Sequence, residues 1–309
     1  MKRRGGGSAS CSKNTASARP HKKRFGKDLF FVFGVILLGL YTISFLVPLL
    51  WALMSSFKSE TEFMLGAFKF PINPSFDNYV TAYMNISVPL RVGVGSIFIE
   101  EMFVNTLIYA GLCTLMHTLT PCIAAYAAAK YHFKFSRIMY GIVIVTMILP
   151  VIGNTASELQ MSRILHFYDS FIGLAIMRGH FLGTNFLIYY ASFRSLANDF
   201  ADAARVDGAS QWCVMTRIMI PLVKPTIAAI ALISFITYWN DYMTAMLYLP
   251  SHPTISYGLY YFTHSSSNQS SFFTVQIAGC MLICIPILLV FILFKNKLMG
   301  NMAIGGIKG

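Results

Sequence analysis

Long apolar runs separated by short polar loops dominate the chain. Each run is close to the roughly 20 apolar residues that an α-helix needs to cross a hydrocarbon core of about 30 Å. The six runs lie near residues 29–54, 104–129, 137–157, 171–193, 225–249 and 272–294. Helices are favoured, because backbone amides in lipid must be satisfied within the segment and the runs lack the alternation of barrel strands. The pattern predicts an all-α polytopic membrane protein with six transmembrane helices.

The composition agrees with this pattern. Of the 309 residues, 56% are hydrophobic, 15% are aromatic and only 12% are charged, which is far more apolar than a soluble domain. The net charge of +12 raises the alternative of a nucleic-acid-binding protein. The positions of the basic residues argue against nucleic acid as a partner, because these residues follow the predicted membrane boundaries.

The basic residues are divided unequally between the two sides of the predicted membrane. Nine of the 24 lie in the first 27 residues, and ten more lie in alternate loops on the same side. The opposite side holds only Lys58, Lys69, Arg91 and Arg163. The positive-inside rule therefore predicts that both termini and the loop before the fifth run are cytoplasmic.

That loop is a polar, helix-compatible stretch between two long apolar runs, and we call residues 195–224 the polar segment. Asp202 lies in the early turns of a predicted short helix, and Asp207-Gly208 is a turn dipeptide that ends it. In a second predicted helix, apolar residues recur at i, i+3, i+4 and i+7, namely Met215, Ile218, Met219 and Leu222. Pro221 and Pro225 then redirect the chain into the fifth run. On periodicity alone, an ordinary amphipathic interfacial loop explains the polar segment equally well.

The order of residues in the polar segment is more specific than its period. Residues 202–209 read DAARVDGA, and Ile220-Pro221 follows. This order resembles the EAA loop of ATP-binding cassette importer permeases, most closely those of the carbohydrate-uptake branch. Asp202 stands where the family usually has Glu, and Ala197 stands where a Pro is common, which leaves the strength of docking open.

Other segments resemble the same family in the same order along the chain. They are Phe103–Leu107, Ala124–Ala127, Met147–Pro150, Tyr238–Tyr242 and the final Gly300–Gly309. The stretches at 158–185 and 250–271 match the family only weakly. Because these stretches include surfaces that would meet the solute or a binding protein, the sequence constrains the solute poorly.

The resemblance implies a permease subunit that forms half of the translocation path for a sugar or oligosaccharide. It assigns coupling to a separate ATPase to the residues Asp202, Ala203, Ala204, Asp207, Gly208, Ala209 and Pro221. The small residues among them, Ala203, Ala204, Gly208 and Ala209, would let the partner approach the backbone closely. The implied partners are an ATP-binding cassette ATPase dimer, a second permease subunit and an extracytoplasmic solute-binding protein. The implied location is a bacterial or archaeal cell membrane.

Enzymatic chemistry has no support in the sequence. No G-x-x-x-x-G-K-S/T phosphate loop occurs, so ATP and Mg²⁺ are expected on the partner ATPase and no cofactor is expected on this chain. Metal-ligand spacing and a nucleophile with a base are also lacking. Cys280 and Cys284 are spaced to share a helix face, and we interpret them as small packing residues rather than metal ligands. Permeation of another solute class, secondary transport and a scaffold role stay open as alternatives.

The predicted organisation follows from the runs and the resemblance. Residues 1–28 form a basic, disordered cytoplasmic tail that can contact anionic lipid, and residues 29–54 form an uncleaved first span. An extracytoplasmic loop covers 55–103. The permease core at 104–294 holds five helices and the polar segment, and 295–309 form a second cytoplasmic tail.

Polar residues inside the predicted spans are candidates for the translocation path, because exposing them to lipid is costly. Tyr238, Asn240 and Asp241 lie in the fifth run and combine hydrogen-bonding groups with rings suited to a sugar face. Arg178 lies midway along the fourth run. The alternatives are helix packing for the fifth-run residues and the outer membrane interface for Arg178.

Overall fold

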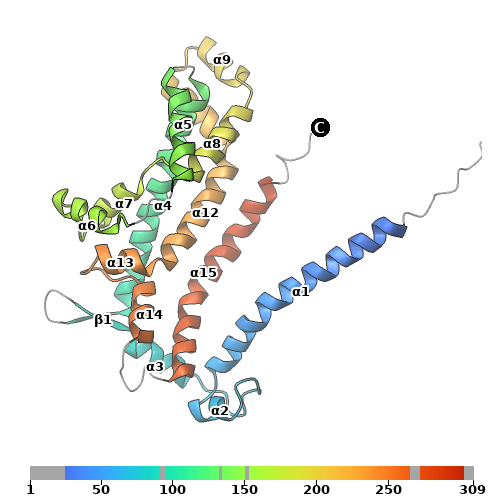
Figure 1. Cartoon of the computed structure of the whole chain (residues 1–309), viewed down its shortest axis with the longest axis vertical. Helices are drawn as coiled ribbons and strands as arrows, with labels where there is room; N and C mark the ends of the chain where they lie inside the picture. Colours follow the sequence, from blue (N-terminus) through green and yellow to red (C-terminus); the bar gives the residue numbers. More distant parts are fainter. Residues whose placement is uncertain (1–24, 91–94, 132–133, 150–152, 265–271, 303–309) are drawn as a thin grey trace, which may run out of the picture. The chain divides into compact units, whose positions relative to one another are not determined.

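The computed structural model describes residues 25–90, 95–131, 134–149, 153–264 and 272–302 (Figure 1). Most of the predicted N-terminal tail and the last seven residues of the predicted C-terminal tail lie outside these ranges. The chain divides into two units, Met1–Leu50 and Trp51–Gly309. The first unit is helix α1 (Phe25–Ser56) up to Leu50, an uninterrupted apolar helix that matches the predicted first span.

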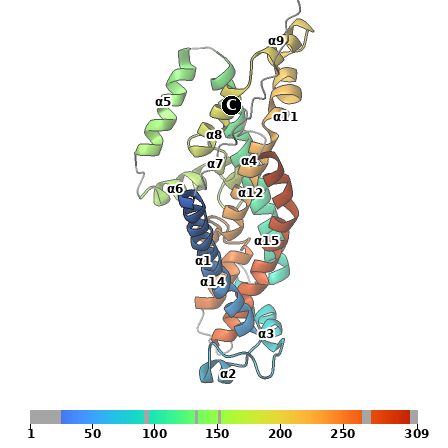
Figure 2. The ribbon, with the colours of Figure 1, turned by 90° about the vertical axis from the view of Figure 1, so that its right-hand side faces the viewer.

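The second unit is built around helix α4 (Ile99–Lys130), which is about 48 Å long at 1.5 Å per residue. Helices α8 (Thr184–Ser195), α12 (Lys224–Asn240) and α7 (Phe171–Arg178) pack against it. Helix α15 (Phe273–Met302) packs against α12, and Figures 1 and 2 both show α15 beside it. The prediction of an all-α fold is confirmed, with one short hairpin added.

Short elements lie around the N-terminal half of α4 (Figure 1). They are α2 (Glu60–Leu65), α3 (Asp77–Asn85), β1 (Ser87–Pro89), β2 (Ser96–Phe98), α13 (Tyr242–Tyr248) and α14 (Ile255–His264). The two strands pair antiparallel with Val88 opposite Ile97. The α4 side chains Asn105 and Thr106 hold the chain before α14, since Asn105 Nδ2 donates to the Pro253 carbonyl at 3.2 Å and the Ile255 amide donates to Thr106 Oγ1 at 2.8 Å.

The loop after α1 closes on a buried lysine. Lys58 is fully buried, and its Nζ donates to the carbonyl oxygens of Gly66 at 3.1 Å and Ala67 at 2.9 Å. Trp51 Nε1 donates to the same Ala67 oxygen at 3.0 Å, and Asn78 Nδ2 donates to the Lys58 carbonyl at 2.7 Å. These bonds satisfy the charged group through backbone dipoles alone and fix the loop between α1 and α3.

Within the described residues, three helices are long and apolar enough to cross a membrane, namely Phe31–Ser56, Ile99–Lys130 and Phe273–Leu293. A fourth span is possible if Gln211–Leu222 and Lys224–Asn240, which meet at a bend of 74°, count as one. The count of six is therefore not reproduced as six continuous helices.

The predicted helix over 137–157 corresponds to α5 (Lys134–Ile148), followed by the separate helix α6 (Thr155–Ile164). At 15 residues, α5 is shorter than the roughly 20 residues that a perpendicular span requires. Predicted continuity through 157 is wrong for this segment.

The predicted helix over 171–193 is also wrong as one element, because α7 ends at Arg178 and α8 begins at Thr184. Gly179 follows α7, and Gly183 has φ +142°, a conformation open to glycine and unfavourable for other residues. Two glycines four positions apart thus break a run whose hydropathy is continuous.

The predicted helix over 225–249 breaks at Asp241. Helix α12 ends at Asn240, and the Asp241 carboxylate accepts a hydrogen bond of 3.0 Å from the Thr244 amide, which caps the N-terminus of α13. Asn240 and Asp241 therefore lie at a junction between two helices and not deep within one.

Candidate functional site

The polar segment lies at the C-terminal end of α4, opposite the hairpin (Figure 1). It contains α9 (Asp199–Val206), α10 (Gln211–Cys213), the π-helix η1 (Val214–Met219) and α11 (Ile220–Leu222). Lys130, the last residue of α4, donates to the Leu196 carbonyl at 2.7 Å and to Asn198 Oδ1 at 2.8 Å. Tyr131 donates to Gln211 Oε1 at 3.0 Å. The end of α4 is therefore hydrogen-bonded to the polar segment both before and after α9.

Helix α9 has one face buried and one face exposed. Ala201 and Ala204 are 4% and 9% exposed and belong to the core that includes Tyr126 and Phe193. Asp207 and Gly208 end the helix, and Gly208 has φ +82°, which strongly favours glycine at this turn. The two alanines thus attach the helix to the bundle. Within the part of the chain that the structure describes, the opposite face of α9 is exposed and can contact a partner.

Large apolar side chains are exposed on α9 and on the following helix α10. Phe200, Val206 and Trp212 are 55%, 88% and 67% exposed. Asp202 forms an ion pair of 2.8 Å with Arg205 beside them. Because exposed Trp and Phe side chains are typical anchors of protein interfaces, this face is suited to dock a protein. The sequence reasoning missed Phe200 and Trp212, although both aromatic residues are conspicuous in a polar loop.

The structure divides the small residues predicted to meet the partner. Ala203 and Gly208 are exposed, whereas Ala204 is buried and Ala209 packs partly against the same core. Ala204 is turned to the same side of α9 as Ala201, because a helix rotates by about 100° per residue, and Ala209 packs on the core after the helix has ended. Ala203 and Gly208 therefore offer the exposed small positions, and the coupling role of all four residues stays a prediction. Pro221 is exposed and lies at the start of α11, just before the 74° bend into α12.

The predicted second helix of the polar segment is divided into α10, η1 and α11, and its apolar stripe is only partly buried. Met215 and Met219 are buried as predicted, and Ile218 is half-buried. Leu222 is 43% exposed. Residues Val214–Met219 form a π-helix, and π-helical turns often occur at functional sites. Hydrophobic periodicity does not distinguish this turn from an α-helix.

Three of the four predicted substrate-path residues come together in the bundle. Tyr109 donates a hydrogen bond of 3.1 Å to Asp241 Oδ2, and its ring lies 5.9 Å from that of Tyr238, edge to face. Arg178 Nη2 donates to Thr244 Oγ1 at 3.3 Å, while the Thr244 amide donates to Asp241 Oδ1. Thr244 therefore bridges Arg178 and Asp241. Tyr109 and Thr244 were missed because each is a single polar residue in an apolar stretch, with no adjacent polar residue in the sequence to draw attention to it.

A second polar group adjoins this network on α4. His117 Nδ1 and Ser234 Oγ are 3.1 Å apart, and the His117 ring is 5.7 Å from Tyr238 and 5.8 Å from His180. A small pocket of about 150 Å³ opens here, at the break between α7 and α8, and Asn185 contributes to its wall. The break that hydropathy did not reveal thus brings polar groups into the bundle.

Asn240, the fourth predicted residue, is exposed and separate from this network. It lines a pocket of about 250 Å³ formed by the end of α12 with α13, α14 and α15. Cys280 is exposed on α15 and lines the same pocket, so its interpretation as a packing residue is wrong.

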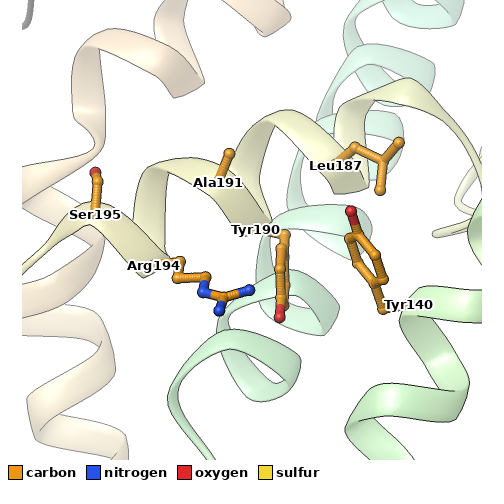
Figure 3. A pocket seen from close by; sticks show the side chains of 6 residues that line it. All are labelled: Tyr140, Leu187, Tyr190, Ala191, Arg194 and Ser195. Carbon is orange, nitrogen blue, oxygen red and sulfur yellow. The ribbon is translucent and has the colours of Figure 1, made fainter.

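A larger pocket of about 420 Å³ lies between α5 and α8 and contains none of the predicted site residues (Figure 3). Tyr190 stands between Tyr140 and Arg194, with its ring 4.9 Å from that of Tyr140 and the Arg194 guanidinium carbon 6.0 Å from its centre. The described residues contain no group of three His, Cys, Asp or Glu side chains placed to hold a metal ion.

Comparison with known proteins agrees with this geometry. Residues 121–300 match the sequence model of a family described as binding-protein-dependent transport system inner membrane component. The match covers more than half of the chain and includes the polar segment, the 74° bend and most of α15.

Similar proteins of known role are also transport permeases. The chain is 25% identical over 272 residues to the diacetylchitobiose uptake system permease protein NgcG of Streptomyces coelicolor, covering 87% of this chain and 86% of that protein. It is 25% identical over 295 residues to the arabinooligosaccharides transport system permease protein AraQ of Bacillus subtilis, covering 93% and 96%.

The fold matches a solved structure. A chain in the crystal structure of a bacterial ABC transporter involved in the import of the acidic polysaccharide alginate superposes with a TM-score of 0.70. The identity is 22%, and the match covers 90% of this chain and 99% of that chain.

Proposed function

Since the chain belongs to the family of binding-protein-dependent transport system inner membrane components, we propose that it is a permease subunit of an ATP-driven carbohydrate importer. The family and the apolar helices make it a multi-pass membrane protein and a transport component, not an enzyme. Similar permeases belong to transport systems for diacetylchitobiose, arabinooligosaccharides and trehalose, which supports a sugar or oligosaccharide as the solute.

The exposed face of α9 carries this proposal. Ala201 and Ala204 fix α9 to the core, while Phe200, Val206 and Trp212 are exposed at the end of the bundle. A rigidly attached helix with an apolar outer face can pass the movement of a docked protein to the spans. In the proposed orientation both termini and α9 are cytoplasmic, so α9 meets the ATPase.

The proposed assembly has four kinds of component. A dimer of ATP-binding cassette ATPases binds ATP and Mg²⁺ and docks on α9 and on its counterpart in a second permease subunit. The two permeases together enclose the path. An extracytoplasmic binding protein delivers the solute at the end that holds the hairpin, and the family description supports that partner.

The test is ATP-dependent uptake by the complete importer in proteoliposomes. Ala203→Arg and Gly208→Arg place a long cation on the exposed side of the polar segment, and each should abolish uptake while the subunit still inserts. Thr61→Arg, at an exposed site in α2 at the other end of the unit, is the matched control and should retain the copurified ATPase that the two polar-segment variants lose.

The outcomes separate the alternatives. Uptake that survives both α9 changes and continues without the ATPase would indicate a secondary transporter. Assembly without uptake of any solute would indicate a scaffold. ATP-dependent uptake of amino acids or ions, but of no sugar, would retain the permease role and overturn the carbohydrate assignment.

A further inference from the structure

The pocket beside Asn240 is distinct from both the α9 face and the Tyr109–Asp241 network, and we call it the α14 pocket. It joins the ends and sides of four helices, α12, α13, α14 and α15. Its walls are formed by Asn240, Tyr242, Ser256, Leu259, Tyr260, Thr263, Cys280 and Ile283. Its volume of about 250 Å³ is just below the range of about 300–1,000 Å³ typical of sites for drug-sized ligands, so it fits one ring-sized unit.

A column of three stacked rings forms one side of this region. The rings of Tyr242 and Tyr260 are nearly parallel, with centroids 4.5 Å apart and planes at 11°. His264 continues the column, 4.3 Å from Tyr260 at 26°. A contact of 2.9 Å between His264 Nδ1 and the Tyr260 carbonyl fixes the last ring. The column is pre-organised, which lowers the entropy cost of binding another flat or ring-shaped group against it.

The polar groups of the α14 pocket are neutral. Its lining contains an amide, hydroxyl groups and a thiol, and no Asp, Glu, Lys or Arg. Asn240 Nδ2 donates to the Ile236 carbonyl at 2.8 Å, and the Thr263 hydroxyl donates to the Leu259 carbonyl at 3.0 Å. Each side chain is oriented by one donor and keeps acceptor capacity for a ligand, because an amide oxygen and a hydroxyl oxygen each carry two lone pairs.

Polar side chains on the exposed sides of α12 and α15 indicate that water, and not lipid, surrounds the α14 pocket. Asn240 and Cys280 are exposed on α12 and α15, two helices that belong to the candidate spans. Thr237, one turn before Asn240, is exposed as well. Amide and hydroxyl groups exposed to lipid are costly, so a face that carries them within a membrane protein is expected to line a water-filled space.

We propose that the α14 pocket is a carbohydrate subsite on the wall of the translocation path, where one sugar ring lies against Tyr242, the end of the ring column that lines the pocket, and hydrogen-bonds to Asn240. The C–H face of a pyranose or furanose complements the negative face of an aromatic ring, and its hydroxyls match the neutral amide and hydroxyl groups. This inference rests on the proposed function and adds the site and the chemistry by which this subunit contacts the solute.

Cys280 provides a test that leaves the ring column intact. In the full importer, the other cysteines (Cys11, Cys113, Cys122, Cys213 and Cys284) are replaced by alanine, and transport is checked first. A charged methanethiosulfonate should modify Cys280 through water, and the transported sugar should slow the reaction several-fold. Modification only by a lipophilic maleimide would place the pocket in lipid and overturn the proposal. Absence of modification by either reagent would mean that a protein surface covers the pocket, and would overturn it equally.

Uptake kinetics test the ligand contacts. Diacetylchitobiose, an arabinooligosaccharide and trehalose serve as the first solutes. Tyr242→Leu keeps an apolar side chain but removes the ring at the pocket end of the column, and Asn240→Ala removes the amide. Each should raise the KM for uptake roughly 2- to 12-fold, since the lost aromatic contact and the lost hydrogen bond are each worth about 0.5–1.5 kcal/mol, with little change in maximal rate. Met243→Ala, an exposed change next to Tyr242 on α13 and outside the pocket lining, is the control and should leave the KM unchanged.

The two proposals fail in different ways. If the wild-type importer transports none of a wider panel of sugars, the carbohydrate function fails. If it transports a sugar and the KM is unchanged in both variants, while sugar does not protect Cys280, the subsite is wrong and the permease function stands.

Discussion

Tyr109 and Asp241, 132 positions apart in the sequence, are joined by a hydrogen bond of 3.1 Å from the phenol to the carboxylate. The bond lies where α12 ends and α13 begins, and Asp241 also caps α13 through the Thr244 amide. One carboxylate therefore connects the central helix α4 to a break in the fifth run. The break and its partner on α4 define a single structural junction.

We predict that Tyr109→Phe weakens this junction. Loss of the hydroxyl leaves a carboxylate oxygen without its donor in a mostly buried site, which costs about 1–3 kcal/mol. Thermal unfolding of the purified subunit in detergent should show a lower Tm. Tyr131→Phe removes an exposed hydrogen bond to Gln211 and should change the Tm much less. Equal Tm values for the two variants would contradict the role given to the Tyr109–Asp241 bond.

The two faces of α9 predict opposite behaviour for neighbouring alanines. Ala204→Leu inserts a larger side chain into a packed core and should destabilise the polar segment by about 1–3 kcal/mol. Ala203→Leu adds the same atoms on the exposed side and should change stability by less than about 0.5 kcal/mol. Limited proteolysis after Arg205 measures the difference. Faster cleavage of the Ala203 variant would reverse the assignment of the faces.

Gly208 is predicted to resist substitution for a backbone reason. At φ +82° a Cβ atom is strained even though no heavy atom lies near its position, so Gly208→Ala should cost about 1 kcal/mol. Gly111→Ala, in the middle of α4 and also unhindered, should be neutral or stabilising, because alanine favours helix. Hydrogen exchange of residues 199–213 reports the local loss. Unchanged exchange in Gly208→Ala would show that the turn tolerates a side chain.

Trp212 is predicted to anchor the ATPase. It is 67% exposed in a polar loop, and Trp side chains at interface hot spots contribute about 2 kcal/mol or more. Trp212→Ala should leave the Tm of the free subunit unchanged and reduce the ATPase retained on copurification roughly 10-fold or more. Phe68→Ala, at an 83% exposed aromatic residue at the other end, is the control. Full retention in the Trp212 variant would remove it from the docking face.

The buried lysine predicts a stability change at the opposite end. Lys58→Met removes two charge-assisted bonds to the Gly66 and Ala67 carbonyls and should cost about 1.5–3 kcal/mol. Lys69→Met, on an exposed side chain of the same loop, should have little effect. Proteolysis of the loop and the Tm measure both. A stable Lys58→Met protein would mean that Trp51 and Asn78 hold the loop without the ammonium.

The location of the polar segment was predictable because its polar composition stands out against an apolar background. Which of its alanines are buried was not predictable. Ala203 and Ala204 are identical in chemistry, and only the packing of α9 against the core that includes Tyr126 and Phe193 buries one and leaves the other exposed. Trp212 and Phe200 carried a signal, because exposed aromatic residues in a polar loop are unusual, but a resemblance based on the DAARVDGA order draws attention to the small residues.

Helix breaks inside apolar runs were not predictable from hydropathy. Glycine is common in transmembrane helices, so Gly179 and Gly183 do not by themselves indicate that a helix ends. Asp241 was noticed as a polar residue, but its use as a cap depends on where Thr244 and Tyr109 lie in three dimensions. For the same reason the sequence grouped Asn240 with Asp241, whereas the end of α12 directs one into the α14 pocket and the other toward α4.

Helix α4 holds a different loop at each of its ends, through Asn105 and Thr106 near the hairpin and through Lys130 at the polar segment. A shift of this one helix therefore changes both ends together. Under the proposed function, thermodynamic linkage then requires reciprocity: if docking of the ATPase changes the affinity of the outer end for the loaded binding protein by some factor, the binding protein changes the affinity of α9 for the ATPase by the same factor. Because α4 reaches both ends, the proposed linkage can be measured on one side of the membrane as a change in binding affinity when the partner on the other side is present.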